Sequence, residues 1–173
     1  MKKQKLPPAP GASSDRADEE RVRARTSEMK VFGWTMGRFE PVRRPWREPV
    51  HAFCVGLVLR LASALGLAVC IVGRTRTGKT YLLDHTCRGK VLNTEGALAR
   101  NNYQPLPFTV AELPRGVFAI DEAGHVDRPS LHLAAATLRC RKVVFAVQHE
   151  SDLQDPGLES VLHGRRVLLL TLT

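Results

Sequence analysis

Apolar residues recur along the second half of the chain in short runs, separated by stretches of mixed composition. The stretch 128–139 places Leu131, Ala135 and Leu138 on one helical face, and 79–87 also has a helical composition. The apolar runs lie near 67–72, 90–93, 116–120, 143–147 and 166–170. Strands that alternate with helices of this length are typical of crossover units. The pattern therefore predicts an α/β fold whose mainly parallel sheet is covered by helices on both faces.

The longest apolar stretch runs from 50 to 72 and is interrupted by Arg60. Its length would suit a membrane span, since about 20 apolar residues cross a bilayer. An arginine near the membrane centre costs about 2.5–3.5 kcal/mol, however, and the end of this stretch is needed as a strand. We expect a helix over about 50–65, an end at Gly66, and then a buried strand. Contact with a membrane stays open as the alternative.

Composition limits the number of domains. The chain has 173 residues, of which 43% are hydrophobic and 25% charged, which suits one compact domain with a tail. Four cysteines without C-x-x-C spacing argue against a zinc knuckle or a disulfide-stapled secreted fold. No apolar signal segment follows the basic start of the chain. We expect a cytoplasmic protein, with a peripheral position at the inner face of a membrane left open.

The net charge of +9 is concentrated at the start of the chain, where residues 1–48 hold 12 Lys and Arg against 7 Asp and Glu. We divide the chain into this basic, partly disordered arm, an apolar helix at 49–66, and an α/β domain at 67–173. Aromatic and arginine residues alternate late in the arm, around Trp46. Such a mixture can bind DNA by stacking and phosphate contacts. Alternatively, the aromatic side chains pin the arm to the domain surface.

The clearest chemical signal is a G-x-x-x-x-G-K-[ST] sequence between the strand at 67–72 and the helix at 79–87. It consists of Gly73, Arg74, Thr75, Arg76, Thr77, Gly78, Lys79 and Thr80. The two glycines let the backbone N–H groups surround phosphate oxygens at a helix N-terminus. Lys79 is expected to face a solvated site and reach the β- and γ-phosphates, while Thr80 is expected to bind Mg²⁺.

A second signal is the acidic end of the apolar run near 116–120, where Asp121 and Glu122 follow directly. The carboxyl ends of parallel strands form the edge at which ligands bind in open α/β sheets. At that edge Asp121 is placed to hold Mg²⁺ through water, and Glu122 is placed to polarise an attacking water molecule. Both residues are therefore candidates for the same site as the loop 73–80.

These two segments resemble the Walker A and Walker B motifs of P-loop NTPases, which have a three-layer core. The Asp-Glu pair resembles the group in which an extra strand separates the two motif strands. The run 143–147 suits that inserted strand, and Gln148 after it matches the family's sensor of the γ-phosphate. Within this group the chain looks like the conjugation, DNA-translocation and Zot-like phage assembly ATPases.

The resemblance implies binding and hydrolysis of ATP with Mg²⁺, and a role in DNA transfer, plasmid or phage maintenance, or assembly. It also implies a homo-oligomer or a larger transfer machine, with an arginine supplied in trans. The candidates for that arginine are Arg139, Arg141, Arg165 and Arg166. ATP is favoured over GTP because the guanine-reading signature of GTPases is absent. Two alternatives stay open: a nucleotide-gated adaptor with little turnover, and a small-molecule or nucleotide kinase.

Overall fold

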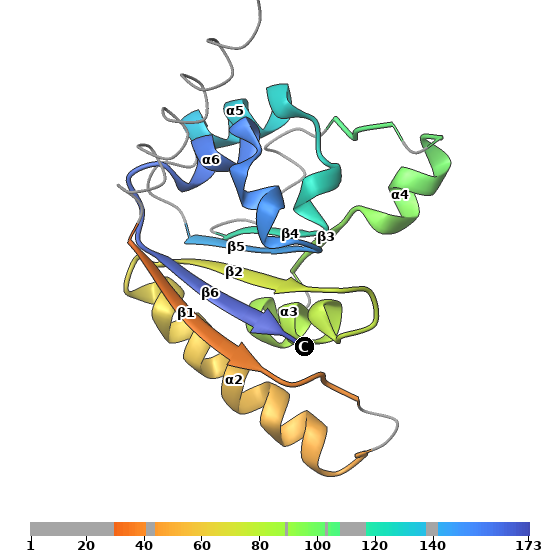
Figure 1. Cartoon of the computed structure of the whole chain (residues 1–173), viewed down its shortest axis with the longest axis vertical. Helices are drawn as coiled ribbons and strands as arrows, with labels where there is room; N and C mark the ends of the chain where they lie inside the picture. Colours follow the sequence, from red (N-terminus) through yellow and green to blue (C-terminus); the bar gives the residue numbers. More distant parts are fainter. Residues whose placement is uncertain (1–29, 41–43, 89, 103, 108–116, 138–141) are drawn as a thin grey trace, which may run out of the picture.

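Helices and parallel strands alternate along the chain in the computed structural model (Figure 1). It describes residues 30–40, 44–88, 90–102, 104–107, 117–137 and 142–173. The strands are β1 (Val31–Met36), β2 (Ala68–Gly73), β3 (Leu92–Asn93), β4 (Val117–Asp121), β5 (Lys142–Val147) and β6 (Val167–Leu172). The helices are α2 (Arg47–Ala64), α3 (Lys79–Cys87), α4 (Glu95–Arg100), α5 (Arg128–Thr137) and α6 (Pro156–Leu162), with single 3₁₀ turns η2 (Ala123–His125) and η3 (Glu150–Gln154).

The six strands form one sheet in the order β1-β6-β2-β5-β4-β3, and every neighbouring pair is parallel. Helices α2 and α3 lie on one face of the sheet, and α5 and α6 lie on the other (Figure 1). The predicted α/β class and the parallel sheet covered on both faces are confirmed. The predicted strands and helices recur with shifts of a few residues at their ends.

The central strands are apolar throughout because both of their faces are buried. Along β2, Cys70 and Val72 face the core beneath α5 and α6, whereas Val69 and Ile71 face the core beneath α2 and α3. A strand that is covered on both sides loses the alternation of apolar and polar residues, which explains the continuous run in the sequence. Burial also raises the pKa of the Cys70 thiol, so this cysteine packs as a small neutral side chain.

Helix α2 begins at Arg47, three residues before the expected start, and ends at Ala64. The turn after it has Gly66 at φ +85°, a conformation that favours glycine, and so the predicted end is confirmed. Close packing against α3 favours glycine at position 56, because a Cβ there would lie 3.1 Å from the carbonyl carbon of His85. No helix among the described residues is long and apolar enough to cross a membrane.

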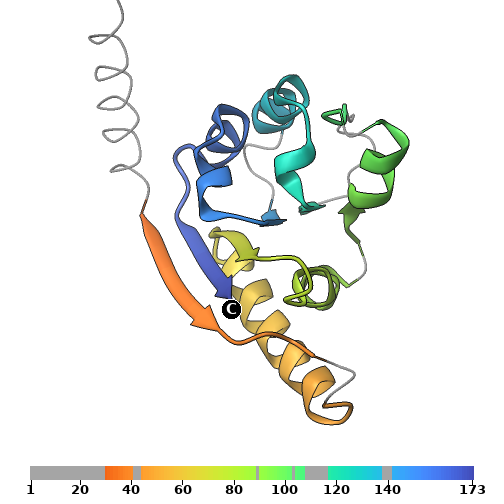
Figure 2. The same ribbon diagram turned by 45° about the vertical axis from the view of Figure 1, so that its right-hand side comes forward.

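Strand β1 is a feature that the sequence did not predict. Residues 31–36 run along β6 in parallel register, from Val31 opposite Val167 to Met36 opposite Leu172 (Figure 2). Part of the segment assigned to the basic arm therefore forms the edge of the sheet. The aromatic residues of the arm differ in their surroundings, because Phe39 is buried while the side chain of Trp46 is 88% exposed. The expected disorder of residues 1–20 concerns a segment outside the described residues.

Candidate functional site

The glycine-rich loop joins the end of β2 at Gly73 to the start of α3 at Lys79. The Thr77 hydroxyl donates a hydrogen bond to the Arg74 carbonyl oxygen at 2.8 Å, which closes the loop on itself. A Cβ at Gly73 would lie 2.5 Å from the Thr77 Oγ1 atom, so only glycine fits there. Arg74 and Arg76 are exposed, as expected for the variable positions of the loop.

Phe39 covers the loop from the segment that follows β1. Its backbone N–H donates to the Thr77 carbonyl oxygen at 3.1 Å, and its ring lies 5.2 Å from the His51 ring of α2. Gly78 has φ +91°, and a Cβ there would lie 2.7 Å from the Phe39 Cβ atom. The end of the loop is therefore fixed by its own backbone conformation and by a residue 39 positions earlier in the chain.

We expect Gly78→Ala to destabilise the protein by about 2 kcal/mol and to weaken phosphate binding. A left-handed conformation costs an L-residue roughly 1–2 kcal/mol, and the contact with Phe39 adds to this. Urea unfolding should detect the change. Gly33→Ala is the matched control because a Cβ there meets nothing within 4 Å, so its stability should change by less than about 0.5 kcal/mol. Equal losses in both variants would contradict the role of the loop conformation.

Two contacts join the loop and α3 to the acidic end of β4. The Thr80 hydroxyl donates to the Asp121 Oδ2 atom at 2.6 Å, and the two residues are 41 positions apart. The Lys79 Nζ atom lies 3.1 Å from the Glu122 Oε1 atom in an ion pair. The structure thus brings together the four residues that the sequence assigned to one site.

The surroundings of Lys79 differ from the expected open site. Its side chain is only 5% exposed, and its ammonium group donates to the carbonyl oxygens of Gly73 at 2.6 Å and Arg74 at 3.2 Å. The prediction that Lys79 faces a solvated site is wrong, because the loop folds around the ammonium group. Burial with full hydrogen bonding fixes the position of this charge and makes its removal costly.

Strand β5 lies between β2 and β4 and pairs with both. The predicted insertion of this strand between the two motif strands is therefore confirmed as a matter of strand order. Gln148 follows β5 directly, which places it at the same edge of the sheet. Within the described part of the chain, its side chain makes no hydrogen bond to Lys79, Asp121 or Glu122. A role for Gln148 as a sensor stays a prediction.

Thr94 is a residue of the site that the sequence did not indicate. It follows the short strand β3, is buried, and donates its hydroxyl to the carbonyl oxygens of Asp121 at 2.8 Å and Glu122 at 3.2 Å. Glu122 has φ +53°, a left-handed conformation that is uncommon for glutamate. The Thr94 hydroxyl therefore holds the strained backbone from which both carboxylates project.

We expect Thr94→Val to lower the hydrolytic rate proposed below about tenfold and the stability by about 1–3 kcal/mol. The substitution keeps the shape of the side chain but leaves the buried Asp121 carbonyl group and the partly buried Glu122 carbonyl group without their shared donor. Thr86→Val is the matched control, because that buried hydroxyl donates to the Leu82 carbonyl oxygen within α3. The control should lose comparable stability and keep its rate. Equal rates in the two variants would show that Thr94 has no positioning role.

Asp84 lies one helical turn beyond Thr80 on α3. Burial, and secondarily the negative charge of Asp121, raise the pKa of Asp84 above its usual value. A third carboxyl group is therefore close enough to Asp121 to sense its charge. Two histidines also lie near this edge. His149 caps the turn η3. The buried Nδ1 atom of His125 has no hydrogen-bond partner among the described residues.

The candidate arginines lie away from this edge or outside the described residues. Arg165 and Arg166 precede β6, whose first residue Val167 pairs with Ala68 at the start of β2. That position is the opposite edge of the sheet from Lys79, so neither arginine reaches the site of its own chain. Arg139 and Arg141 lie outside the described residues. An arginine in trans stays a prediction for all four.

The edge thus combines a buried ammonium group, an exposed hydroxyl and two carboxylates on a fixed backbone. Comparison with protein-family models, curated proteins and solved structures finds no match to this chain. What the site can do follows from the chemistry of its own residues. Hydroxyl and carboxylate oxygen atoms can bind a divalent metal ion, and the Lys79 ammonium group beside a helix N-terminus can bind the phosphates that the metal ion accompanies.

Proposed function

We propose that this chain is a P-loop NTPase that binds ATP with Mg²⁺ at the carboxyl edge of β2, β5 and β4 and hydrolyses it. One observation carries the proposal: the two acidic residues at the carboxyl end of β4 contact the phosphate-loop motif, at 2.6 Å for Thr80 with Asp121 and 3.1 Å for Lys79 with Glu122. Each contact joins one residue of the glycine-rich loop motif to one residue of the acidic motif, and the sequence had selected the two motifs independently.

The phosphate groups would lie against the loop and the N-terminus of α3. Backbone N–H groups of the first helical turn have no partner within the helix, and the helix dipole adds a partial positive charge of about +0.5. Lys79 is held at this end by the Gly73 and Arg74 carbonyl groups. Its ammonium group would exchange the Glu122 carboxylate for β- and γ-phosphate oxygens.

Thr80 and Asp121 fit Mg²⁺ because they present a hydroxyl and a carboxylate oxygen 2.6 Å apart. When bound, the ion neutralises charge on the phosphates during transfer. Thr80 and Asp121 would orient it, and Thr94 would hold the Asp121 and Glu122 carbonyl groups in place. Once the Lys79 ammonium group has turned to the phosphates, the Glu122 carboxylate would be free to accept a proton from the attacking water molecule.

The Lys79–Glu122 ion pair also favours a second candidate function, a nucleotide-gated adaptor with little turnover. While the Glu122 carboxylate stays paired with the Lys79 ammonium group, its Oε1 atom is occupied and is not free to accept a proton from water. In such a protein ATP would be bound and slowly released. The rate of hydrolysis in single turnover separates the two candidates.

We also propose that ATP hydrolysis serves DNA transfer, plasmid or phage maintenance, or assembly, because the motifs resemble those of DNA-transfer and assembly ATPases. Contact with DNA is supported by the exposed Trp46 side chain, which lies between exposed Arg44 and Arg47. An indole and two guanidinium groups in solvent are free to stack on bases and to pair with phosphates. Most of the basic arm lies outside the described residues.

The test is an ATP assay on the full chain with Mg²⁺, with and without single-stranded DNA, and with a panel of small hydroxyl-bearing acceptors. Release of inorganic phosphate without an acceptor supports the hydrolase. Tight ATP binding with less than one turnover per hour supports the adaptor. Transfer that needs an acceptor supports a kinase. Absence of ATP binding would refute the assignment of the loop.

A further inference from the structure

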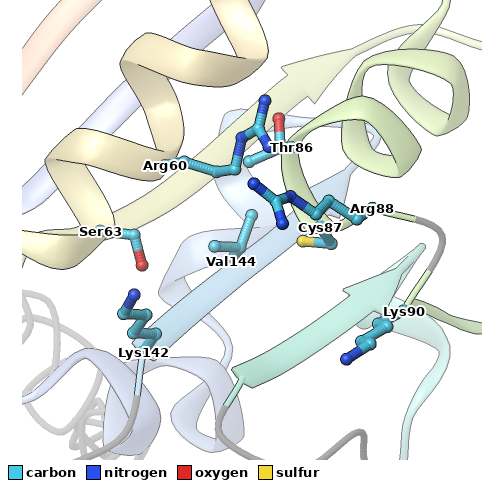
Figure 3. A pocket seen from close by; sticks show the side chains of 8 residues that line it. All are labelled: Arg60, Ser63, Thr86, Cys87, Arg88, Lys90, Lys142 and Val144. Carbon is cyan, nitrogen blue, oxygen red and sulfur yellow. The ribbon is translucent and has the colours of Figure 1, made fainter.

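A basic cavity lies on the opposite edge of the sheet from the phosphate loop, between α2, α3 and the start of β5 (Figure 3). Its volume is about 290 Å³. Four cationic side chains and two hydroxyl-bearing residues line it, and Val144 of β5 forms part of its wall. The Thr86 hydroxyl already donates to the Leu82 carbonyl oxygen. The six polar residues are Arg60, Ser63, Thr86, Arg88, Lys90 and Lys142.

The cavity carries an excess of positive charge, since no aspartate or glutamate is among its described lining residues. Arg60 donates to the Gly56 carbonyl oxygen at 3.2 Å and lies over the Phe53 ring. Arg88, Lys90 and Lys142 make no ion pair with any described residue. Cys87 adds no negative charge because burial raises the pKa of its thiol to about 12.

The C-terminal ends of α2 and α3 both meet this cavity, and their dipoles offset part of the positive charge. Each helix terminus contributes a partial charge of about −0.5, so two termini balance roughly one cation. Among the described groups, about three of the four positive charges are therefore left without a negative counterpart. Like charges gathered at one opening raise the local concentration of anions.

Ser63 is the independent observation that points to a ligand. Its side chain is 4% exposed, and its Oγ atom is buried without a hydrogen-bond partner among the described residues. A buried hydroxyl usually finds a partner, because leaving it unpaired costs free energy. Figure 3 shows the Ser63 hydroxyl and the Lys142 ammonium group on one side of Val144, with the guanidinium groups of Arg60 and Arg88 across from them.

We propose that this cavity binds a small phosphate-bearing anion with two or more negative charges, at a site separate from the phosphate loop. The Ser63 hydroxyl would donate to one phosphate oxygen, and Arg88 and Lys142 would neutralise the charge from two sides. The volume lies at the lower end of the range for ligand sites, about 300–1,000 Å³, which favours a pyrophosphate-sized anion over a polymer.

The test titrates inorganic pyrophosphate into the full chain carrying Lys79→Ala and Glu122→Gln, without Mg²⁺, so that the phosphate loop contributes little. Adding Arg88→Gln and Lys142→Gln should weaken binding at least tenfold, the loss typical of one charged hydrogen bond. The matched control adds Lys30→Gln and Arg100→Gln, one lysine and one arginine at exposed positions outside the cavity, and should keep the affinity within twofold. Equal weakening in both would reduce the effect to net charge and overturn the proposal.

Ser63→Ala gives a second test, because it should change the thermal unfolding midpoint and its response to the anion in opposite directions. Without anion it should raise the thermal unfolding midpoint, because it removes an unpaired buried hydroxyl. With pyrophosphate it should reduce the rise in midpoint that the anion produces. A lower midpoint with an unchanged response to pyrophosphate would overturn the proposal. The proposal would also be overturned if pyrophosphate did not bind and a single-stranded oligonucleotide bound in a way that depends on Arg88 and Lys142.

Discussion

Replacing Lys79 with alanine should weaken ATP binding by at least about 100-fold, equivalent to about 2.7 kcal/mol. The ammonium group is the buried cation of the loop, and three oxygen atoms fix its position. Loss of one partner from a buried charge pair typically costs 2–5 kcal/mol. A fluorescent ATP analogue titrated in the presence of Mg²⁺ measures the change.

The same substitution should also destabilise the fold, because it leaves the Glu122 carboxylate without its partner. The double variant Lys79→Ala, Glu122→Gln separates the two effects. Removing the unpaired charge should restore part of the stability in urea unfolding while ATP binding stays lost. If the double variant regained ATP binding along with stability, the lysine would serve the fold alone and the loop would not be its phosphate site.

The sequence predicted the parts of the fold whose signals are local. The run at 67–72, the glycines at 73 and 78, and the helix from Lys79 follow one another within about 20 residues, and each has its own physical signature. Buried parallel strands are apolar on both faces, and a left-handed turn needs glycine. Parallel strands also share a carboxyl edge, so the sequence alone predicts that Asp121 and Glu122 lie beside the loop.

The sequence did not indicate contacts that depend on residues far apart along the chain. Thr94 donates to the carbonyl group of Asp121, 27 residues later, and nothing near a lone threonine marks such a partner. Phe39 packs on Gly78 from a segment that was assigned to the arm. Strand β1 was missed because its edge position leaves Val31 and Phe32 exposed, so it lacks a buried, continuous apolar run.

The burial of Lys79 shows the same limit within the motif itself. The motif identifies the lysine, but the carbonyl groups of Gly73 and Arg74 enclose its ammonium group only once the loop has folded. Glu122 then takes the remaining side of that group. The ion pair makes Glu122 both a partner of the loop and the proposed proton acceptor, and substitution can separate these two roles.

Glu122→Gln should retain ATP and Mg²⁺ but lower the rate of hydrolysis by about 100- to 10,000-fold, the range that a general base typically contributes. The amide keeps the size of the side chain and can still accept a hydrogen bond from Lys79, but it cannot take a proton from water. ATP should bind equally well or more tightly, because the lysine no longer has a competing carboxylate 3.1 Å away. Single-turnover phosphate release measures the rate, and titration of the ATP analogue measures the affinity.

Glu150→Gln, at an exposed carboxylate in the turn after β5, is the control and should hydrolyse ATP normally. Normal turnover in Glu122→Gln would show that another residue activates the water molecule. Loss of ATP binding would show that the Glu122 carboxylate has a structural role.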